Sequence, residues 1–217
     1  MTGSTFTILL GGDLTLTPRL RNALADSRFI AADGGMRHAG ALQVEPELWV
    51  GDFDSASQAL LDAWPRVERQ PYSPEKNETD GEIATAEAIA RGACRLILAG
   101  ALGGERSDHT LQHFLHGMSL AERGLDILLT SGREEGVPLM PDVPRRVDLP
   151  KGSLFSVIGL SDLDGLTISN ARYPLDNFSL PFGSSRTISN VAEGPVHFSL
   201  DRGRAIILAR PYDLTGA

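Results

Sequence analysis

Short apolar runs alternate with longer amphipathic segments over the first 130 residues of the chain. The runs are apolar at consecutive positions, which is typical of strands that helices cover on both faces of a sheet. The longer segments have the periodicity of amphipathic helices. The predicted strands span residues 6–10, 29–32, 48–50, 95–99 and 126–130, and the predicted helices span residues 18–25, 56–64, 80–91 and 110–123. This alternation predicts an open, mainly parallel α/β sheet with helices on both faces.

Two of the predicted helices begin with recognisable caps. Thr17 precedes Pro18, and a hydroxyl cap followed by proline at the first helical position is a typical helix start. Thr79 and Glu82 have the spacing of a capping box, in which each side chain accepts a hydrogen bond from the other residue's backbone amide. The caps place two helix starts at Pro18 and Asp80.

The pattern changes after Ser131. Four prolines interrupt the next segment, so a long helix does not fit there. They are Pro138, Pro141, Pro144 and Pro150. Short, turn-bounded apolar runs follow at residues 153–158, 166–168, 196–200 and 205–208, and residues 201–203 have the composition of a hairpin loop. This part of the chain is predicted to form a small antiparallel β unit, which gives domains at residues 1–135 and 145–217.

Composition and charge exclude several classes of function. Apolar residues make up 41% of the chain and charged residues 22%, which is ordinary globular usage. The net charge of -8 argues against nucleic acid or an anionic membrane as the main partner, because both select an excess of Lys and Arg. Cys94 is the only cysteine and lies in an apolar run, so we expect a buried thiol and a cytoplasmic protein without disulfides. No apolar run approaches the roughly 20 residues that cross a bilayer.

Two glycine-containing segments follow the first two predicted strands, where an open α/β sheet binds its ligands. Gly11 and Gly12 permit close approach of a ligand to the backbone, although an ordinary turn uses glycines in the same way. Asp33, Gly34 and Gly35 offer a carboxylate and free amide donors to a nucleotide, although a helix cap with a tight turn has the same composition.

The segment from Gly51 to Ser55 gives the most specific indication of a functional site. Asp52 and Asp54 directly follow a buried strand, and carboxylates two residues apart project to the same side of an extended chain. Like charges held close together favour a cation between them, and Mg²⁺ takes carboxylate and phosphate oxygens. The alternative is a helix start capped by Asp54 or Ser55, but a cap needs only one of the acids. We therefore predict a magnesium site here.

Two further polar segments precede predicted helices. The first spans residues 75–80, where Lys76 can neutralise phosphate charge and Asp80 can ligate a metal near the positive end of a helix. The second runs from residue 100 to residue 109 and combines glycines with Arg106 and an Asp108-His109 pair, which suits a phosphate cradle. Its sequence is not a Walker A motif, and the chain contains no Gly-x-Gly-x-x-Gly fingerprint.

Taken in order, these segments resemble the thiamine pyrophosphokinase (thiamine diphosphokinase) family. The matching pieces are Asp33-Gly34-Gly35, Gly51-Asp52-Phe53-Asp54-Ser55, Lys76 to Asp80, Gly103-Gly104 with Arg106, Asp108-His109 and Ser189-Asn190. The resemblance implies an N-terminal ATP-binding catalytic α/β domain and a C-terminal thiamine-binding β-sandwich. It also implies a homodimer with the active site near the subunit interface, and Mg²⁺-dependent transfer of the pyrophosphoryl group of ATP to the thiamine hydroxyl, releasing AMP.

The resemblance also assigns roles to individual residues. The implied catalytic and metal-binding residues are Asp52, Asp54 and Asp80. The implied ATP-binding residues are Gly12, Asp33, Gly34, Gly35, Lys76, Asn77, Thr79, Gly103, Gly104, Arg106, Asp108 and His109. Ser189 and Asn190 are implied to bind thiamine. Physical reasoning agrees, because attack of an alcohol on phosphorus depends on alignment and charge neutralisation.

The chain departs from the family pattern at three positions. Asn77 stands where many relatives have Asp, Glu105 is inserted before Arg106, and His113 stands where an Asn is common. Two other functions remain open at this point. The first is a related diphosphokinase that acts on a hydroxymethylpterin, and the second is a nucleotide- or thiamine-binding sensor without catalysis.

Overall fold

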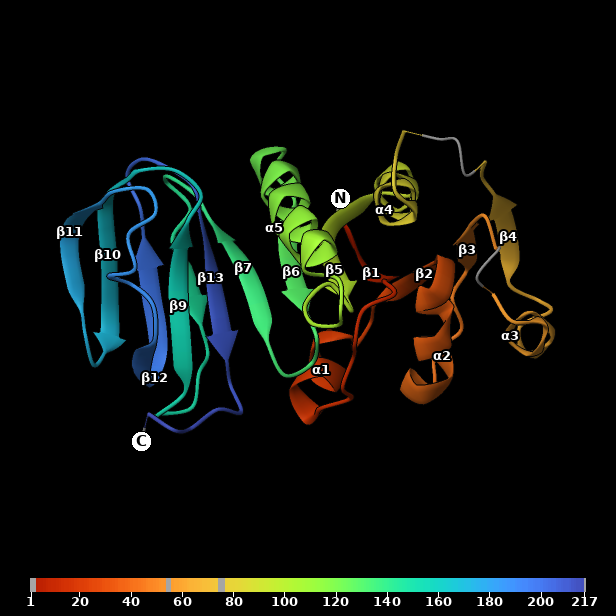
Figure 1. Ribbon diagram of the computed structural model, residues 1–217, viewed down its shortest axis with the longest axis horizontal. Helices are drawn as coiled ribbons and strands as arrows, with labels where there is room; N and C mark the ends of the chain where they lie inside the picture. The colour runs from red at the N-terminus through yellow and green to blue at the C-terminus, as the bar shows by residue number, and fades with distance from the viewer. Residues whose placement is uncertain (1–2, 54–55, 74–76, 217) are drawn as a thin grey trace. The chain divides into compact units, whose positions relative to one another are not determined.

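A computed structural model describes residues 3–53, 56–73 and 77–216 of the chain. Two compact units follow each other along the sequence, Met1–Gly132 and Arg133–Ala217 (Figure 1). The first unit alternates strands and helices, and the second consists of strands and turns. No helix within the described residues is long and apolar enough to span a membrane.

The sheet of the first unit is parallel at each recorded pairing, in the order β6-β5-β1-β2-β3-β4. Its strands are β1 (Ser4–Leu9), β2 (Arg28–Ala32), β3 (Leu48–Gly51), β4 (Glu68–Pro71), β5 (Ala93–Ala99) and β6 (Asp126–Thr130). The chain winds outward from β1 to β4 and then returns to the other side of β1 to form β5. The order of winding therefore reverses between β1 and β5, which is where open α/β sheets bind ligands beyond the carboxyl ends of their strands.

Helices cover both faces of this sheet, as predicted, with α4 and α5 on one face and α1 and α2 on the other (Figure 1). The helices are α1 (Pro18–Ala23), α2 (Arg37–Leu42), α3 (Gln58–Ala63), α4 (Asp80–Ala90) and α5 (Ser107–Glu122), and a 3-10 helix (Asp33–Met36) leads into α2. The central strands β1, β2 and β3 are largely buried, whereas the edge strand β4 is mostly exposed. Phe6, Ile8, Ile30 and Leu48 expose none of their surface, which explains the continuous apolar runs in the sequence.

Both predicted helix caps are confirmed. The Thr17 hydroxyl accepts a hydrogen bond from the Leu20 amide at 3.1 Å, with Pro18 at the first helical position. Thr79 and Glu82 form the complete capping box at the start of α4. The start of α3 differs from the alternative considered for the acidic segment, because its cap is Ser57 and not Asp54 or Ser55.

The second unit is an antiparallel β-sandwich. Its strands are β7 (Glu135–Leu139), β8 (Arg145–Val147), β9 (Leu154–Gly159), β10 (Leu163–Ala171), β11 (Leu175–Leu180), β12 (Asn190–Ser199) and β13 (Ala205–Arg210). One sheet has the order β7-β13-β9-β12, and the other joins β8, β12, β10 and β11. Strand β12 belongs to both, since its first residues pair with β9 and its later ones with β8 and β10.

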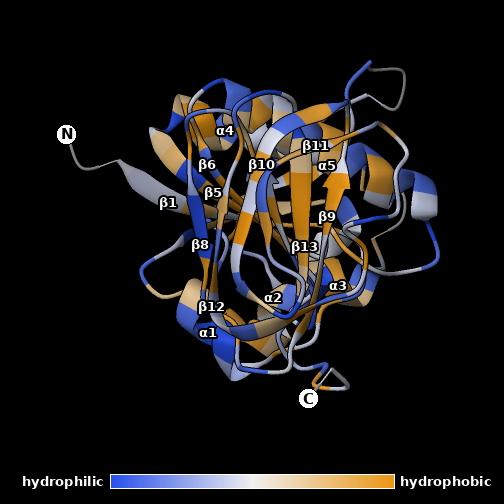
Figure 2. Cartoon of the chain, turned by 90° about the vertical axis from the view of Figure 1, so that its left-hand side faces the viewer, coloured by the Kyte–Doolittle hydropathy of each residue, from blue (hydrophilic) through white to orange (hydrophobic). Residues whose placement is uncertain are grey.

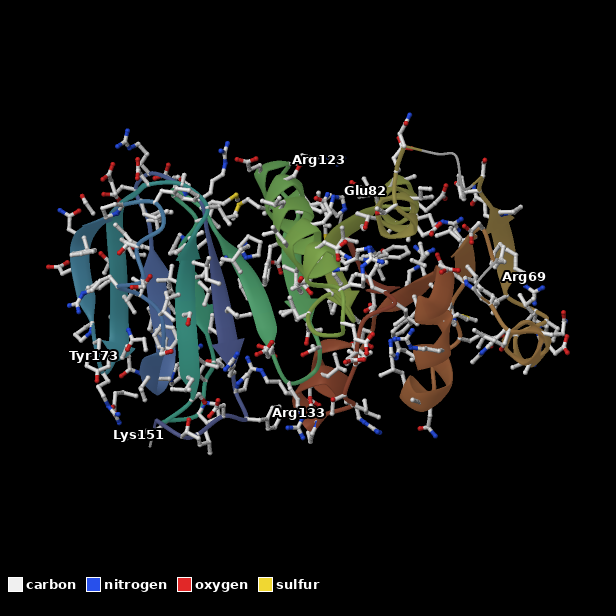
Figure 3. All side chains as sticks on the ribbon, in the orientation of Figure 1. Arg69, Glu82, Arg123, Arg133, Lys151 and Tyr173 are labelled. Carbon is white, nitrogen blue, oxygen red and sulfur yellow. The ribbon has the colours of Figure 1, made fainter. Side chains whose placement is uncertain are left out.

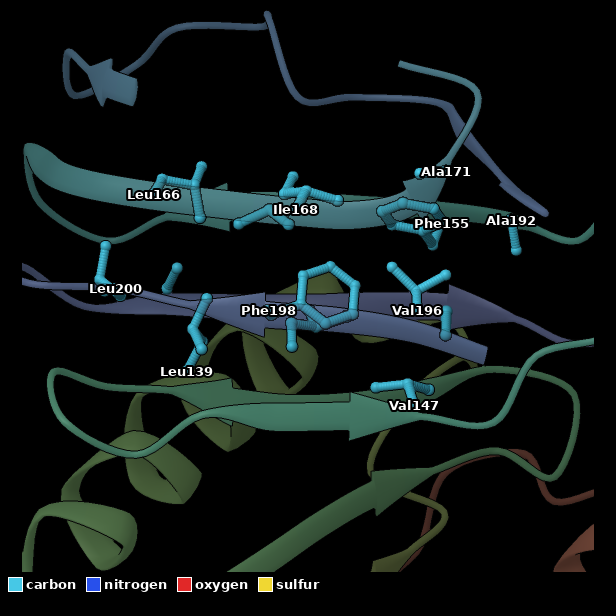
Figure 4. Close-up of a cluster of buried hydrophobic side chains, with 14 of the residues drawn as sticks. Leu139, Val147, Phe155, Leu166, Ile168, Ala171, Ala192, Val196, Phe198 and Leu200 are labelled. Carbon is cyan, nitrogen blue, oxygen red and sulfur yellow. The ribbon is translucent and has the colours of Figure 1, made fainter. Parts of the chain in front are cut away.

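Hydrophobic side chains from the two sheets of the sandwich fill the space between them (Figure 4). The rings of Phe155 and Phe198 meet edge to face with their centroids 5.5 Å apart. Hydrophobic positions concentrate on strands such as β9, β10 and β13, while the connecting loops are largely hydrophilic (Figure 2). The second unit therefore has a hydrophobic core of its own.

Two expectations about local structure are wrong. Residues 201–203 do not form a hairpin loop, because β13 pairs with β7 and β9 while the end of β12 that precedes the loop pairs with β8 and β10. The segment instead connects the two sheets. Cys94 is exposed, because burial in β5 becomes complete only from Leu96 onward.

Candidate active site

The loops that follow β1 and β5 are packed tightly against each other at the point where the winding reverses. A Cβ atom on Gly12 would lie 2.2 Å from the carbonyl oxygen of Gly100 and 3.1 Å from that of Gly103, so only glycine fits at position 12. The φ angles of Gly103 and Gly104 are +86° and +95°, in the region that favours glycine. The predicted glycine segments after β1 and β5 therefore form one backbone-lined surface, which a phosphate group can approach closely.

The Asp33-Gly34-Gly35 segment adjoins the same edge of the sheet. It forms the first three residues of the 3-10 helix, and a Cβ atom on Gly35 would lie 2.0 Å from the Leu9 carbonyl oxygen at the end of β1. The indole of Trp49 donates a hydrogen bond to the Asp33 carbonyl oxygen at 2.9 Å. Asp33 itself has a φ of +41°, which is unusual for a residue with a side chain and typical of functional sites.

Asp52 directly follows β3, as predicted, and is half-buried. Gly51 lies against Asp33, since a Cβ atom on Gly51 would be 3.2 Å from the Asp33 Cα. The next residue, Phe53, has a φ of +61° and packs its ring edge to face against Trp49 with the centroids 5.1 Å apart. These contacts place Asp52 beside the Asp33 segment. Asp54, the second acid of the predicted pair, lies outside the described residues.

The first turn of α4 brings Asp80 to the end of β1. A Cβ atom on Gly81 would lie 2.9 Å from the Cδ2 atom of Leu10, which directly follows β1. Asp80 is half-buried in this turn, close to the positive end of the helix dipole. Thr79 is the N-cap residue of the capping box, and Asn77, two residues earlier, is exposed. Lys76 lies outside the described residues.

Glu82 lies in the first turn of α4, on the side of α5 (Figure 3). Burial alone would raise the pKa of its carboxyl group. Hydrogen bonds from the Thr79 amide at 2.8 Å and the Thr79 hydroxyl at 3.0 Å outweigh burial and lower this pKa below its ordinary value of 4.5. The charged form of Glu82 therefore holds the start of the helix that carries Asp80.

A small pocket separates α4 from α5 above the ends of β1 and β5. It is lined by Leu10, Thr79, Gly81, Glu82, Thr85, Leu98, Gln112, His113 and His116. His113 shares a hydrogen bond of 2.9 Å with the Ala101 carbonyl oxygen, so its Nδ1 carries the proton. Burial lowers the pKa of both His113 and His116. His113, which stands where an Asn is common in the family, is thus a neutral hydrogen-bond donor to the loop after β5.

Arg106 and Asp108 form a bidentate ion pair at the start of α5. Arg106 Nε donates to one carboxylate oxygen at 2.9 Å and Nη2 to the other at 2.7 Å, which holds the pKa of Asp108 well below its usual range. Both side chains are exposed. α5 begins at Ser107, three residues earlier than predicted, so Asp108 and His109 lie in its first turn.

Ser189 and Asn190 belong to the second unit, where β12 begins. Asn190 is buried, and its side chain accepts hydrogen bonds from the amides of Tyr173 at 3.1 Å and Val191 at 2.8 Å and donates to the Tyr173 carbonyl at 2.8 Å. Tyr173 lies at the edge of the unit (Figure 3). Ser189 is exposed, with a φ of +60°, and its amide donates to the Ser156 hydroxyl at 3.0 Å. Asn190 thus fixes the loop, and Ser189 is presented at the surface.

Among the described residues, no three His, Cys, Asp or Glu side chains gather closely enough to hold a metal ion. The predicted metal set of Asp52, Asp54 and Asp80 includes a residue outside the described part of the chain. Of the two described members, Asp52 follows β3 and Asp80 lies in the first turn of α4, and carboxylate oxygens are the donors that Mg²⁺ prefers in proteins. The donor chemistry fits the predicted ion.

Sequence reasoning missed two residues of this edge, Arg37 and His38. Arg37 Nη2 donates to the carbonyl oxygens of Gly11 and Gly12, the latter at 3.2 Å, and His38 Nε2 lies 2.9 Å from the Gly12 carbonyl oxygen. The only sequence signal was a basic pair shortly after Asp33-Gly34-Gly35, which is common on helix surfaces.

Comparison with known proteins supports the reading of both units. Residues 21–129 match the family model of the thiamin pyrophosphokinase catalytic domain, and residues 142–204 match that of the thiamin pyrophosphokinase vitamin B1 binding domain. Thiamine pyrophosphokinase from Bacillus subtilis is 28% identical over 202 residues, which cover 86% of this chain and 88% of the relative.

Solved structures of similar proteins share the fold. A thiamin pyrophosphokinase from Geobacillus thermodenitrificans is 27% identical with a TM-score of 0.80, over 95% of this chain and 97% of that one. The Bacillus subtilis enzyme superimposes with a TM-score of 0.83 at 24% identity, over 95% of this chain and 99% of that one, which supports the fold. Together with the two matched domains, these likenesses show that the chain belongs to the thiamin pyrophosphokinase family of enzymes.

Proposed function

We propose that this chain transfers the pyrophosphoryl group of ATP to the hydroxyl group of thiamine and releases AMP. The observation that carries the proposal is the grouping of the glycine loops after β1 and β5 with Asp33, Asp52 and Asp80 at one edge of the sheet, in a chain of this family. Backbone surfaces and carboxylates together suit a triphosphate with its divalent cation.

ATP binds along this edge. The loops that contain Gly12, Gly103 and Gly104 allow the phosphates to approach the backbone, and Asp33-Gly34-Gly35 continues that surface on the β2 side. Arg106 and Asp108 hold each other in a fixed orientation at the start of α5, which gives the nucleotide a rigid polar contact. The proposed ATP-binding set is completed by Lys76, Asn77, Thr79 and His109, as the family pattern implies.

Asp52, Asp54 and Asp80 are the proposed ligands of Mg²⁺, which, when bound, neutralises the triphosphate charge and polarises its phosphorus–oxygen bonds. The half-buried positions of Asp52 and Asp80 favour this role, because carboxylates in a partly desolvated site bind a hard cation more strongly than exposed ones. Anchoring of the α4 start by Glu82 keeps the Asp80 carboxylate in place.

The transfer forms one bond and breaks one. A lone pair of the thiamine hydroxyl oxygen attacks the β-phosphorus of ATP, and the bond from that phosphorus to the oxygen bridging it to the α-phosphorus breaks. The bonding electrons leave with AMP, and the hydroxyl proton passes to solvent. Alignment of the two substrates supplies most of the rate enhancement in reactions of this kind.

The vitamin B1 binding domain supplies the acceptor. Ser189 is exposed at the start of β12 and is the proposed thiamine contact, while buried Asn190 sets the conformation of the Ser189 loop. Apolar side chains near this loop, Phe182 and Ile188, are exposed by 69% and 47%. These exposed apolar side chains favour the proposal of a homodimer with its active site near the subunit interface. The proposed location is the cytoplasm, where a chain with one exposed cysteine stays reduced.

The test is AMP release from ATP with thiamine as acceptor, in the presence and absence of Mg²⁺. We expect AMP and thiamine diphosphate in equal amounts, and none when EDTA is added. A parallel reaction with a hydroxymethylpterin separates the related diphosphokinase. AMP with the pterin and not with thiamine would overturn the proposed acceptor, and binding of both substrates without any AMP would identify a sensor.

A further inference from the structure

Two neighbouring side chains of α2 hold the loop that follows β1. The Arg37 guanidinium bridges the carbonyl oxygens of Gly11 and Gly12, and the His38 ring bonds the Gly12 carbonyl oxygen at 2.9 Å. A carbonyl oxygen only accepts hydrogen bonds, so the Nε2 atom of His38 carries a proton. Two residues from the second βα unit thus make three hydrogen bonds to two consecutive carbonyl groups of the first.

The two glycines of the Gly11-Gly12 loop differ in how closely the rest of the protein packs against them. The side of Gly12 that a Cβ atom would occupy is packed against the carbonyl oxygens of Gly100 and Gly103. A Cβ atom on Gly11, by contrast, would meet nothing within 4 Å. Consecutive glycines lose more conformational entropy on ordering than other residues. The hydrogen bonds from Arg37 and His38 to the two carbonyl oxygens therefore add a restraint that the glycines themselves do not supply.

The same bonds alter the electrostatics of the strand-end edge. Carbonyl oxygens carry partial negative charge and repel phosphate oxygens, and this edge also carries Asp33, Asp52 and Asp80. A guanidinium bonded to two carbonyl oxygens offsets part of that charge with its own. His38 adds a neutral donor, since burial lowers its pKa below the ordinary value of 6.5.

We propose that Arg37 and His38 are positioning residues that hold the Gly11-Gly12 loop in the conformation that receives the triphosphate of ATP. This inference rests on the proposed function, because it assigns the triphosphate to this edge. It predicts that their loss weakens ATP binding and leaves the affinity for the acceptor alcohol unchanged. A purely structural role would lower thermal stability without separating the two substrates.

The central experiment compares Arg37→Met with Arg95→Met, which also removes one arginine side chain. Arg95 pairs with Asp126 at the start of β5 and β6, the opposite edge of the same sheet. We expect Arg37→Met to raise the KM for ATP on the order of tenfold, the scale of lost hydrogen bonds to a charged group. The KM for thiamine should stay within twofold, and Arg95→Met should leave both values unchanged.

A second pair of variants tests His38 through a conservative replacement. His38→Gln keeps an N–H donor and His38→Ala removes it, so the KM for ATP of the glutamine variant should lie closer to that of the wild type. Hydrogen exchange provides a readout without turnover. The amides of residues 10–14 should exchange faster in Arg37→Met than in the wild type, in the absence of nucleotide.

An unchanged KM for ATP in Arg37→Met, whatever its thermal midpoint, would overturn the inference. Direct titration with Mg·ATP separates this result from failure of the proposed function. If the wild type forms no AMP with thiamine but binds Mg·ATP more tightly than Arg37→Met, the acceptor assignment fails and the inference stands. A wild-type protein that does not bind Mg·ATP would overturn both.

Discussion

Gly12 and Gly100 meet so closely that a side chain on Gly12 would place its Cβ atom 2.2 Å from the Gly100 carbonyl oxygen. The neighbouring glycine has no such contact, which offers a matched pair of substitutions. Gly12→Ala should destabilise the fold by about 1–3 kcal/mol, as expected for overpacking, and lower the affinity for ATP. Gly11→Ala should leave the stability nearly unchanged. Chemical denaturation and nucleotide titration of both variants measure the difference, and equal behaviour of the two would contradict the observed packing.

The acids at the strand-end edge provide a test of charge against position. Asp52→Asn and Asp80→Asn keep the shape of the side chain but remove the charge that neutralises a cation, so we expect kcat to fall by about 100-fold or more. Glu78→Gln removes one negative charge from the same loop and is the control. Steady-state kinetics over a range of Mg²⁺ concentrations measures the effect. Full activity of Asp80→Asn at low Mg²⁺ would remove Asp80 from the proposed metal site.

The exposed Arg106–Asp108 pair should matter to ATP and hardly to stability. Ion pairs at the surface contribute little to folding, so Asp108→Asn should leave the thermal midpoint nearly unchanged. The same substitution frees Arg106 from its bidentate partner and should raise the KM for ATP. Differential scanning fluorimetry and kinetics on one preparation give both values. A large fall in the midpoint with an unchanged KM would assign the pair to the fold.

Stability should decline in mildly acidic solution because of three partly buried histidines. Burial lowers the pKa values of His38, His113 and His116 in the folded chain, while the unfolded chain takes up protons near the ordinary value of 6.5. The unfolded state then binds more protons as the pH falls below about 6.5, so the free energy of unfolding decreases toward the lowered folded-state values. Glu82 adds a separate loss below its ordinary pKa of 4.5.

Urea denaturation between pH 8 and pH 5 measures this dependence. In the double variant His113→Asn/His116→Asn, the free energy of unfolding should depend less on pH than in the wild type. The variant lacks two of the histidines whose pKa is lowered in the folded chain. A profile as steep as that of the wild type would assign the acid sensitivity to other groups.

The buried side-chain amide of Asn190 predicts that the two residues of the proposed thiamine-binding loop, Ser189 and Asn190, have different roles. Asn190→Ala leaves the backbone groups of Tyr173 without their partner and should reduce stability by about 1–3 kcal/mol. Ser189→Ala should leave stability nearly unchanged and raise the KM for thiamine, because Ser189 is exposed. Denaturation curves and acceptor kinetics separate the two effects, and a thiamine KM unaffected by Ser189→Ala would exclude the proposed contact.

The parts of the fold that follow from local sequence were predicted well. The central strands are buried on both faces and therefore leave continuous apolar runs, and the caps at Thr17 and Thr79 depend only on neighbouring residues. The glycine and acidic segments could be placed at one edge because parallel strands end together. The proposed substrates, ATP and thiamine, came from the resemblance of these segments to the family.

The features that were missed depend on contacts between distant segments. β11 and β8 are largely exposed or polar, so their sequences carry no continuous apolar run. α2 has only six residues and depends on the preceding 3-10 helix. The start of α5 was placed too late because Arg106 and Asp108 are polar and precede the amphipathic pattern. The link from Arg37 to Gly12 spans 25 residues and has no local signature.

Strand β12 has a consequence for how the second unit unfolds. Its first residues, Asn190 and Val191, pair with β9, and its later residues pair with β8 and β10. Pulling β12 out of one sheet therefore removes a strand from the other as well. Loss of β12 would take an end strand from one sheet and an inner strand from the other, so we expect the unit to open as a single cooperative block. The loop that presents Ser189 directly precedes this shared strand, so we expect the loop to stay ordered until the unit opens.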